Sequence, residues 1–334
     1  MSLKNTVTNV SERVQTVHQR ISQHQYLGHP LAPILALIAV FAIAPPLIGR
    51  ELLLGLMLVF GVFAVAYNLV LGYSGLVSFG HAAFFGTGSY VVIFALDGGF
   101  SIIGSFLAVA AISAVLGAVI GLISLRRRGI YFAMITLALG QAIYGFIFYS
   151  EFTGGADGLI LETVEPSLLF GVVSLDFTNS LVSYYFILGA SLLVLLILYR
   201  IVRSPFGLTL EAIRENEERA NHLGYNVQFT LLNSFVISAM FSGIMGGLLM
   251  LLINITSPTN AHWLTGGEVL IMVLLGGVHS FTGPLVGSVV FYTLSEVFLT
   301  FTDNHLLFLG ITLLIIVLFI PDGAVGSLRD ALER

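Results

Sequence analysis

The chain has 334 residues, of which 57% are hydrophobic and only 9% are charged, and its mean hydropathy is +0.99. A soluble domain carries about 25% charged residues, so this composition excludes a soluble globular protein and indicates one embedded in a lipid bilayer. The net charge of −5 is spread over loops, nothing indicates nucleic-acid binding, and the absence of cysteine excludes disulfides and thiolate metal sites.

Residues 1–30 form a polar tail without the apolar core and cleavage site of a removable signal. Apolar residues recur in this tail at spacings of three and four: Val7, Val10, Val14, Val17 and Ile21. That spacing predicts an amphipathic helix, which could lie on the membrane surface or bind a partner. We therefore expect a cytoplasmic amphipathic tail over 1–30 and a transmembrane domain over 31–334.

Ten apolar stretches follow the tail, at 31–49, 52–71, 76–96, 102–124, 130–149, 181–199, 229–253, 266–276, 284–300 and 305–320. Every backbone polar group inside a bilayer must be satisfied within the protein, which restricts spanning segments to helices and closed barrels. These stretches are continuously apolar, whereas barrel strands alternate. The sequence thus predicts an all-α, polytopic transmembrane helix bundle of about ten spans.

The basic residues give the orientation of the bundle. Twelve of the 13 fall in the two tails or in the even-numbered gaps: Lys4, Arg13, Arg20, Arg126, Arg127, Arg128, Arg200, Arg203, Arg214, Arg219, Arg329 and Arg334. Only Arg50 lies in an odd-numbered gap. Because positive charge near span ends stays on the cytoplasmic side, both termini are predicted to be cytoplasmic.

Glycine and other small residues are concentrated between 72 and 90, around His81. Small residues let helices pack closely, but polar groups inside a membrane usually face the protein interior or an aqueous path. The segment therefore reads either as a broken, pathway-lining helix or as packing alone. A similar glycine-rich segment at 275–284 hints at an internal repeat, and the sequence leaves open whether spans three and eight are continuous.

Two connections between spans are long and hydrophilic. Residues 151–176, predicted outside, carry five acids and no base, which suits either solvated surface or a docking site for a protein. On the inner side, the sequence predicts a charged helix over about 208–223, preceded by Ser204 and Pro205 as start signals and closed by Gly224. This helix suits docking into a groove on a cytoplasmic protein, although a solvated linker helix is the alternative.

Several segments resemble one family in order along the chain: Asn68-Leu69-Val70-Leu71-Gly72-Tyr73-Ser74-Gly75-Leu76-Val77-Ser78-Phe79-Gly80-His81, Arg128-Gly129-Ile130-Tyr131-Phe132-Ala133-Met134, Thr153-Gly154-Gly155-Ala156-Asp157-Gly158, Ala212-Ile213-Arg214-Glu215-Asn216-Glu217, Leu274-Leu275-Gly276-Gly277-Val278-His279 and Phe319-Ile320-Pro321-Asp322-Gly323. The family is that of the branched-chain amino acid ABC transporter permeases, specifically the LivM-type subunit. The chain departs from the family pattern at Tyr131-Phe132 and at Gln141.

The resemblance implies a multi-pass permease in the cytoplasmic (inner) membrane of a prokaryote, without a cofactor. Its implied partners are a LivH-like second permease, two cytoplasmic ATP-binding subunits and an extracytoplasmic substrate-binding protein. The cargo is expected to be branched-chain or other apolar amino acids, with urea, amides or another small solute as the alternative. The chain has no G-x-x-x-x-G-K-[ST] loop, so we expect ATP to bind elsewhere.

We expect the contact with the ATP-binding subunits to involve Glu211, Ala212, Ile213, Arg214, Glu215, Glu218, Ala220 and Gly224. Spans two, three, five and eight are expected to line the translocation path with Asn68, Ser78, His81, Ser89, Thr136 and Gln141. A secondary transporter would need acids within its spans, and the candidates Glu268 and Glu296 fall near predicted span ends. An intramembrane enzyme would need converging catalytic groups or metal ligands, and the histidines lie in separate segments.

Overall fold

The structure is a computed structural model that describes residues 39–46, 49–161, 167–169, 173–175, 179–301 and 305–319. The chain divides into two units, 1–43 and 44–334. The predicted amphipathic tail over 1–30 lies outside the described residues. Of the first expected span, 39–46 is described as helical.

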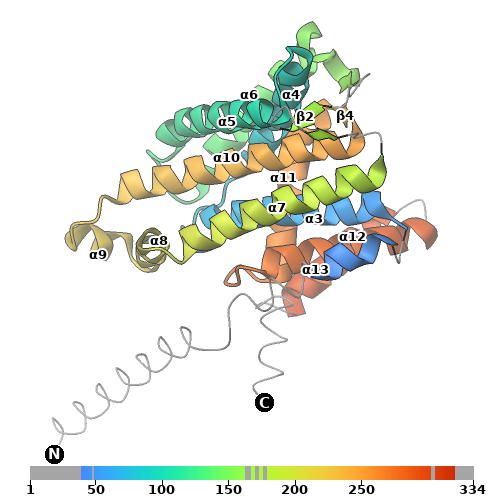
Figure 1. Ribbon diagram of the computed structural model, residues 1–334. Helices are drawn as coiled ribbons and strands as arrows, with labels where there is room; N and C mark the ends of the chain where they lie inside the picture. The colour runs from blue at the N-terminus through green and yellow to red at the C-terminus, as the bar shows by residue number, and fades with distance from the viewer. Residues whose placement is uncertain are drawn as a thin grey trace, which may run out of the picture. The chain divides into compact units, whose positions relative to one another are not determined.

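The second unit is a helical bundle, which confirms the predicted all-α class (Figure 1). Its helices are α3 (Glu51–Asn68), α4 (His81–Asp97), α5 (Ile102–Ser124), α6 (Ile130–Tyr149), α7 (Ser180–Val202), α8 (Pro205–Glu215), α9 (Glu217–His222), α10 (Val227–Ile253), α11 (Trp263–Gly276), α12 (Gly283–Phe301) and α13 (His305–Phe319). A π-helix, η1 (Leu69–Tyr73), extends α3, and single 3-10 turns lie at η2 (Glu151–Thr153), η3 (Gly155–Asp157) and η4 (Pro258–Ala261).

Sheet is confined to two short antiparallel pairs in the described chain. Strand β1 (Leu159–Ile160) pairs with β4 (Ile255–Thr256), with Leu159 opposite Thr256. Strand β2 (Ser167–Leu169) pairs with β3 (Val173–Leu175). The first pair joins the loop after α6 to the loop after α10, so these two connections lie at the same end of the bundle.

Six helical segments in the described chain are long and apolar enough to cross a membrane: Glu51–Tyr73, Ile102–Ser124, Ile130–Tyr149, Ser180–Val202, Val227–Ile253 and Gly283–Phe301. Helix α11 is apolar but shorter. The limits of α5 and α6 coincide with the predicted stretches 102–124 and 130–149. The count of ten spans and the position of the termini stay predictions.

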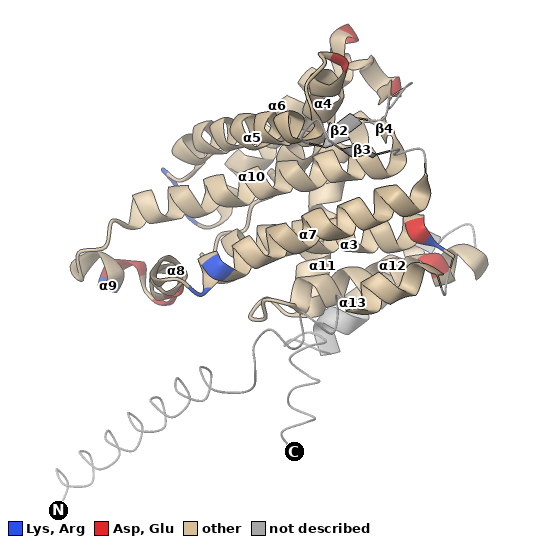
Figure 2. Ribbon diagram, viewed as in Figure 1, with Lys and Arg blue, Asp and Glu red and all other residues tan. Residues whose placement is uncertain are grey.

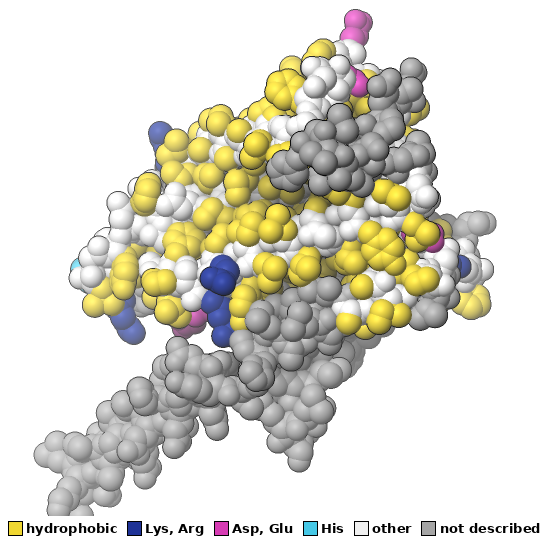
Figure 3. All heavy atoms as spheres, in the orientation of Figure 1, with side chains coloured by type: hydrophobic (Ala, Val, Ile, Leu, Met, Phe, Trp, Pro, Cys, Tyr) yellow, Lys and Arg dark blue, Asp and Glu magenta, His cyan; other side chains and the backbone are white. Residues whose placement is uncertain are grey.

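Helices α3 and α10 form the centre of the bundle. Within their most apolar windows, 89% of the α3–η1 segment and 67% of α10 are buried, against 22% of α6. The peripheral helices α5, α6 and α7 expose large apolar side chains such as Leu107, Met134 and Leu193. Figure 3 shows hydrophobic side chains over the face formed by α5, α10 and α7. An apolar outer surface of this kind suits lipid rather than water.

The glycine-rich segment 72–90 is closely packed and partly non-helical, and its role in lining a path stays a prediction. Helix α4 approaches α10 closely, because a Cβ on Gly88 would overlap the carbonyl of Gly243. The expected third span is nonetheless helical only from His81, and residues 75–80 before it are non-helical. The segment predicted as span three is therefore non-helical at its start and then one continuous helix, and α11 is a short helix without an interior break.

The non-helical segment obtains hydrogen bonds from other parts of the bundle. The Leu76 amide donates to the Val70 carbonyl at 2.9 Å, and the Phe79 amide donates to Thr136 Oγ1 at 3.3 Å. Irregular backbone at membrane depth is tolerated when it is buried in protein and its polar groups are satisfied. Thr136 on α6 thus helps to stabilise the non-helical backbone.

The two ends of the bundle differ in charge (Figure 2). We call the end that carries Arg126–Arg128, Arg200, Arg203, Arg214 and Arg219 the arginine-rich end. The single exception to the charge pattern, Arg50, lies at the opposite end, where its Nη1 is 2.6 Å from Glu296 Oε1. That ion pair accounts for both Arg50 and one of the two candidate span acids. The other candidate, Glu268, was predicted near the end of a span. In the structure it lies within α11, which begins at Trp263.

Candidate functional site

The most elaborate arrangement outside the apolar helices is the α8–α9 pair at the arginine-rich end. Ser204 caps α8, since its side chain accepts from the Phe206 amide at 3.2 Å, and Pro205 occupies the first turn. The single helix expected over 208–223 is wrong. The helical segment begins earlier, at Pro205, and Asn216 divides it into α8 and α9. The backbone of Asn216 is extended, with φ −162° and ψ 102°.

Asn216 starts α9 as its N-cap, because Asn216 Oδ1 accepts from the Arg219 amide at 2.8 Å. Glu217 and Glu218 follow in the first turn, where acids favour the positive end of a helix. An asparagine followed by two acids is a helix-start signal within the sequence. The continuous helical periodicity around it concealed that signal.

One face of α8–α9 is buried against the protein's own helices. Leu210, Ile213 and Ala220 are at most 3% exposed and belong to a core cluster that includes Leu231 and Phe235 of α10. Ile213 and Ala220 were expected to contact a partner. The structure corrects that expectation, since the same apolar periodicity serves an internal contact.

The opposite face is exposed. It carries five of the expected contact residues: Glu211, Ala212, Glu215, Glu218 and Gly224. It also presents Leu208 and Leu223, which are 57% and 71% exposed. These two leucines were not among the expected site residues; helical spacing places Leu208 off the buried stripe, whereas it places Leu223 beside Ala220. The exposed face is therefore acidic with two apolar side chains.

Arg214 does not belong to that exposed face. Its Nη1 donates to the Gly72 carbonyl at the end of η1 and lies 3.2 Å from Nδ1 of His279, in the loop between α11 and α12. Its Nη2 is 3.8 Å from the exposed Glu215. Arg214 thus contacts the bundle, and the partner contact expected from the sequence stays a prediction.

A second arginine ties α9 to the bundle. The Nε of Arg128 lies 3.1 and 3.0 Å from the two carboxylate oxygens of Glu217, and Nη2 lies 2.9 Å from one of them. Arg128 Nη1 also donates to the Leu125 carbonyl at 2.7 Å. A forked pair of this kind fixes orientation as well as distance. The loop between α5 and α6 is thereby joined to α9.

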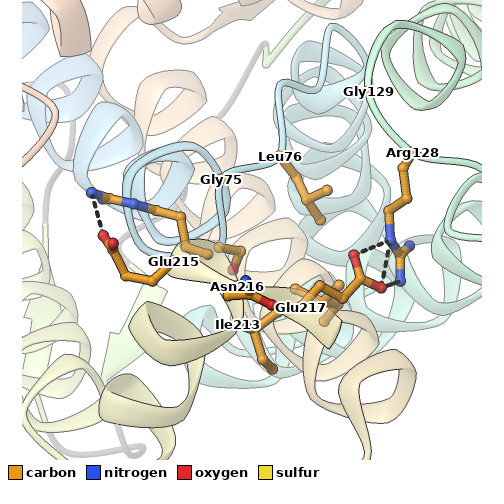
Figure 4. A pocket seen from close by; sticks show the side chains of 11 residues that line it. Gly75, Leu76, Arg128, Gly129, Ile213, Glu215, Asn216 and Glu217 are labelled. Carbon is orange, nitrogen blue, oxygen red and sulfur yellow. Dashed lines mark hydrogen bonds and ion pairs between the residues drawn. The ribbon is translucent and has the colours of Figure 1, made fainter. Parts of the chain in front are cut away.

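An open cavity of about 450 Å³ lies between these two arginine contacts (Figure 4). Its wall is built from Ser74, Gly75, Leu76, Arg128, Gly129, Ile213, Arg214, Glu215, Asn216, Glu217 and Leu231. The break after η1, the α5–α6 loop and both short helices therefore meet at one place.

The expected path residues lie elsewhere, mostly in the packed interior. Asn68, Ser78, His81, Ser89 and Thr136 are each at most 1% exposed, whereas Gln141 on α6 is partly exposed. Ser89 Oγ lies 2.5 Å from Thr256 Oγ1. In the described chain taken alone, five of these six residues are closed off from solvent.

His81 is the centre of a directed hydrogen-bond chain. Its Nε2 lies 3.0 Å from Ser238 Oγ, which itself donates to the Ala66 carbonyl at 2.7 Å, so Nε2 must be the donating nitrogen. Its Nδ1 therefore accepts from Ser78 Oγ at 2.8 Å. The chain joins the start of α4 to α10 and α3.

The chain matches one family of known proteins. The family model described as branched-chain amino acid transport system / permease component matches residues 50–318. The high-affinity branched-chain amino acid transport system permease protein LivM of Salmonella typhimurium is 28% identical over 302 residues, covering 83% of this chain and 70% of that protein. LivM of Escherichia coli K12 is 27% identical over 304 residues, with the same coverage.

The related permease protein LivH of Escherichia coli K12 is 24% identical over 291 residues, covering 82% of this chain and 93% of that protein. No solved structure matches the chain.

Proposed function

The chain belongs to the family of permease components of branched-chain amino acid transport systems, and we propose that it is one membrane-spanning subunit of an ABC importer. In this proposal it moves branched-chain or other apolar amino acids inward, and separate subunits hydrolyse the ATP. The observation that carries the proposal is the two-sided α8–α9 pair. One face is buried in the bundle and the other is exposed at the arginine-rich end.

The exposed face of α8–α9 is the proposed docking site for a cytoplasmic ATP-binding subunit. Glu211, Glu215 and Glu218 supply polar contacts, and Ala212 permits close approach. Binding interfaces depend on a few side chains that become buried in the complex. Leu208 and Leu223, which are exposed in this chain, are suitable candidates for such anchors. The other face is packed against Leu231 and Phe235 of α10. In this proposal, a displacement of α8–α9 is therefore transmitted to the spanning helix α10.

The remaining parts of the transporter are proposed from the relatives. Similarity to both LivM and LivH proteins supports a pair of permeases, this chain with a LivH-like partner, together with two ATP-binding subunits. An extracytoplasmic binding protein would select and deliver the solute. The acidic outer loop, of which Glu151 and Asp157 are described as exposed, is our candidate for its docking surface.

Substitution of Ala212 tests the docking site. Ala212→Trp should prevent copurification of the ATP-binding subunits and abolish uptake, because an indole at this exposed position blocks close approach without disturbing the bundle. Ala111→Trp is the matched control, since Ala111 is an exposed alanine on α5, far along the chain from α8. Normal copurification with Ala212→Trp would rule out this face as the docking site.

The cargo is tested with the complete transporter and its binding protein in vesicles. We expect ATP-dependent uptake of leucine. Uptake of urea but not leucine would show that the cargo is a small amide-like solute rather than an amino acid. Solute movement by this chain alone down a gradient would contradict the importer itself.

A further inference from the structure

Two breaks in the bundle meet beside α8. The first follows η1, and the second is the loop 277–282 between α11 and α12. Asn68, at the end of α3, donates through Nδ2 to the carbonyls of Val278 at 3.1 Å and Ser280 at 3.4 Å. Gly72 lies so close that a Cβ on it would overlap the Val278 carbonyl. The two breaks therefore form one packed unit.

Arg214 enters this unit from α8. It donates to the Gly72 carbonyl, and its Cγ would lie 2.9 Å from a Cβ on Gly75, whose φ of +72° belongs to the left-handed region. Carbonyls in the last turn of a helix lack intrahelical partners and carry the negative end of the helix dipole. A guanidinium has only donors and carries a positive charge. It can therefore bond to such a carbonyl at the end of η1 and also interact favourably with the helix dipole.

The same guanidinium reaches the second break. Nη1 lies 3.2 Å from His279 Nδ1, so one side chain bridges the Gly72 carbonyl and the 277–282 loop. The side chain is 28% exposed, whereas that of its neighbour Glu215 is 77% exposed. At a separation of 3.8 Å, Glu215 is too distant and too solvated to compete with these bonds.

The end of α7 contacts the same loop. The ring of Tyr199 meets that of Phe281 edge-on, with centroids 5.4 Å apart, and the Arg203 guanidinium lies 5.2 Å from the Tyr199 ring centroid. Only Arg203 and Ser204 separate α7 from α8. Tyr199 on α7 and Arg214 on α8 thus each contact the 277–282 loop, the first through Phe281 and the second through His279.

We propose that Arg214, Gly72 and His279 form a coupling latch, in which Arg214 is the positioning residue that transmits movement of α8 to both breaks. The latch rests on the proposed function, since the movement originates when ATP-binding subunits close on the exposed face of α8–α9. Arg214 points away from that face, so the latch transmits the movement without taking part in docking.

The test uses the complete transporter in vesicles, with its second permease, ATP-binding subunits and binding protein. The readout is radiolabelled leucine taken up per ATP hydrolysed, alongside copurification of the subunits. Arg214→Ala should leave assembly and ATP hydrolysis in place and lower this ratio about tenfold, the scale of a typical coupling free energy between sites. Arg127→Ala is the control, because it removes an exposed arginine from the same end without touching the latch.

His279 provides a second set of variants that does not depend on the folding of Arg214→Ala. His279→Leu removes the acceptor and should lower the ratio, whereas His279→Gln keeps an acceptor and should restore much of it. Combining Arg214→Ala with His279→Leu should be no worse than Arg214→Ala alone, since both remove one connection. A purely structural role would lower the amount of assembled transporter but not the ratio.

Each outcome separates the latch from the proposed function. If wild-type transporter takes up leucine and both Arg214→Ala and His279→Leu keep the wild-type ratio, the latch is wrong and the importer stands. If Arg214→Ala fails to assemble, His279→Leu decides the question by the same ratio. If the wild-type chain neither binds ATP-binding subunits nor transports with them, the proposed function fails and the latch falls with it.

Discussion

At the scale of single residues, glycines determine how closely α4 and α10 approach each other, because they have no side chain. Gly88 and Gly243 meet backbone to backbone, and Gly246 would place a Cβ into the Phe85 carbonyl. Helices in a membrane gain association energy from such contacts, since lipid supplies little hydrophobic drive between them. Polar side chains add hydrogen bonds in the same seam, where Ser238 on α10 bonds to both the His81 ring and the Ala66 carbonyl.

Substitution of Gly88 tests this close contact. Gly88→Ala should destabilise the protein by about 1–3 kcal/mol, the usual cost of overpacking, because the Gly243 backbone must shift. The measurement is thermal unfolding in detergent. Gly189→Ala on α7 is the matched control, since a Cβ there has nothing within 4 Å. An equal midpoint for both variants would contradict the close-contact account.

At the scale of elements, the α8–α9 pair is attached to the bundle at several points. The buried stripe packs it against α10, Arg214 joins it to η1, and Glu217 joins it to the α5–α6 loop. The Arg128–Glu217 pair is partly exposed, at 34% and 47%, so its contribution to stability is under about 1 kcal/mol. We assign it to fixing the orientation of α9.

Charge exchange tests that assignment. Arg128→Glu and Glu217→Arg should each increase hydrogen–deuterium exchange in α9, because the forked pair is replaced by repulsion. Combining them should restore most of the protection. Arg127→Glu, beside Arg128 but exposed, should leave α9 unchanged. Unaltered exchange in both single variants would show that the buried stripe alone holds α9.

At the scale of the whole molecule, the non-helical start of the third predicted span and the buried polar seam suit a bundle that changes shape. The segment 75–80 lacks a helical ladder and is held by isolated hydrogen bonds, such as those of the Leu76 and Phe79 amides, so its rearrangement would break fewer backbone hydrogen bonds than unwinding a helix. Ser78 lies in this segment, His81 follows it, and Thr136 on α6 contacts it. They are enclosed here, and we propose that they line the solute path when the permease pair opens.

Cysteine labelling tests this opening, helped by the native absence of cysteine. Ser78→Cys and Thr136→Cys should react with a water-soluble maleimide in at least one nucleotide state of the complete transporter. Ser105→Cys, an equally buried serine on α5, should stay unreactive, and Glu151→Cys in the exposed loop should react throughout. If neither test position reacts in any state, the path lies elsewhere.

Local sequence by itself determined the helical class and most helix limits, because a spanning helix requires only a continuous apolar run bounded by polar or glycine residues. The start signals of α8 were equally local, since Ser204 and Pro205 act on the turn that follows them, although the helix predicted from about 208 began too late. Arginine placement similarly predicted one basic end, and the Arg50–Glu296 pair explains its exception.

Only the tertiary structure decided which face of each element is internal. Ile213 and Ala220 suit a partner or a core equally well, and their burial depends on α10, which follows them in the chain. Arg214 meets Gly72 and His279 across 142 and 65 residues, and His81 meets Ser238 across 157. Such contacts depend on how helices pack, and periodicity within one segment carries no information about the partner's position.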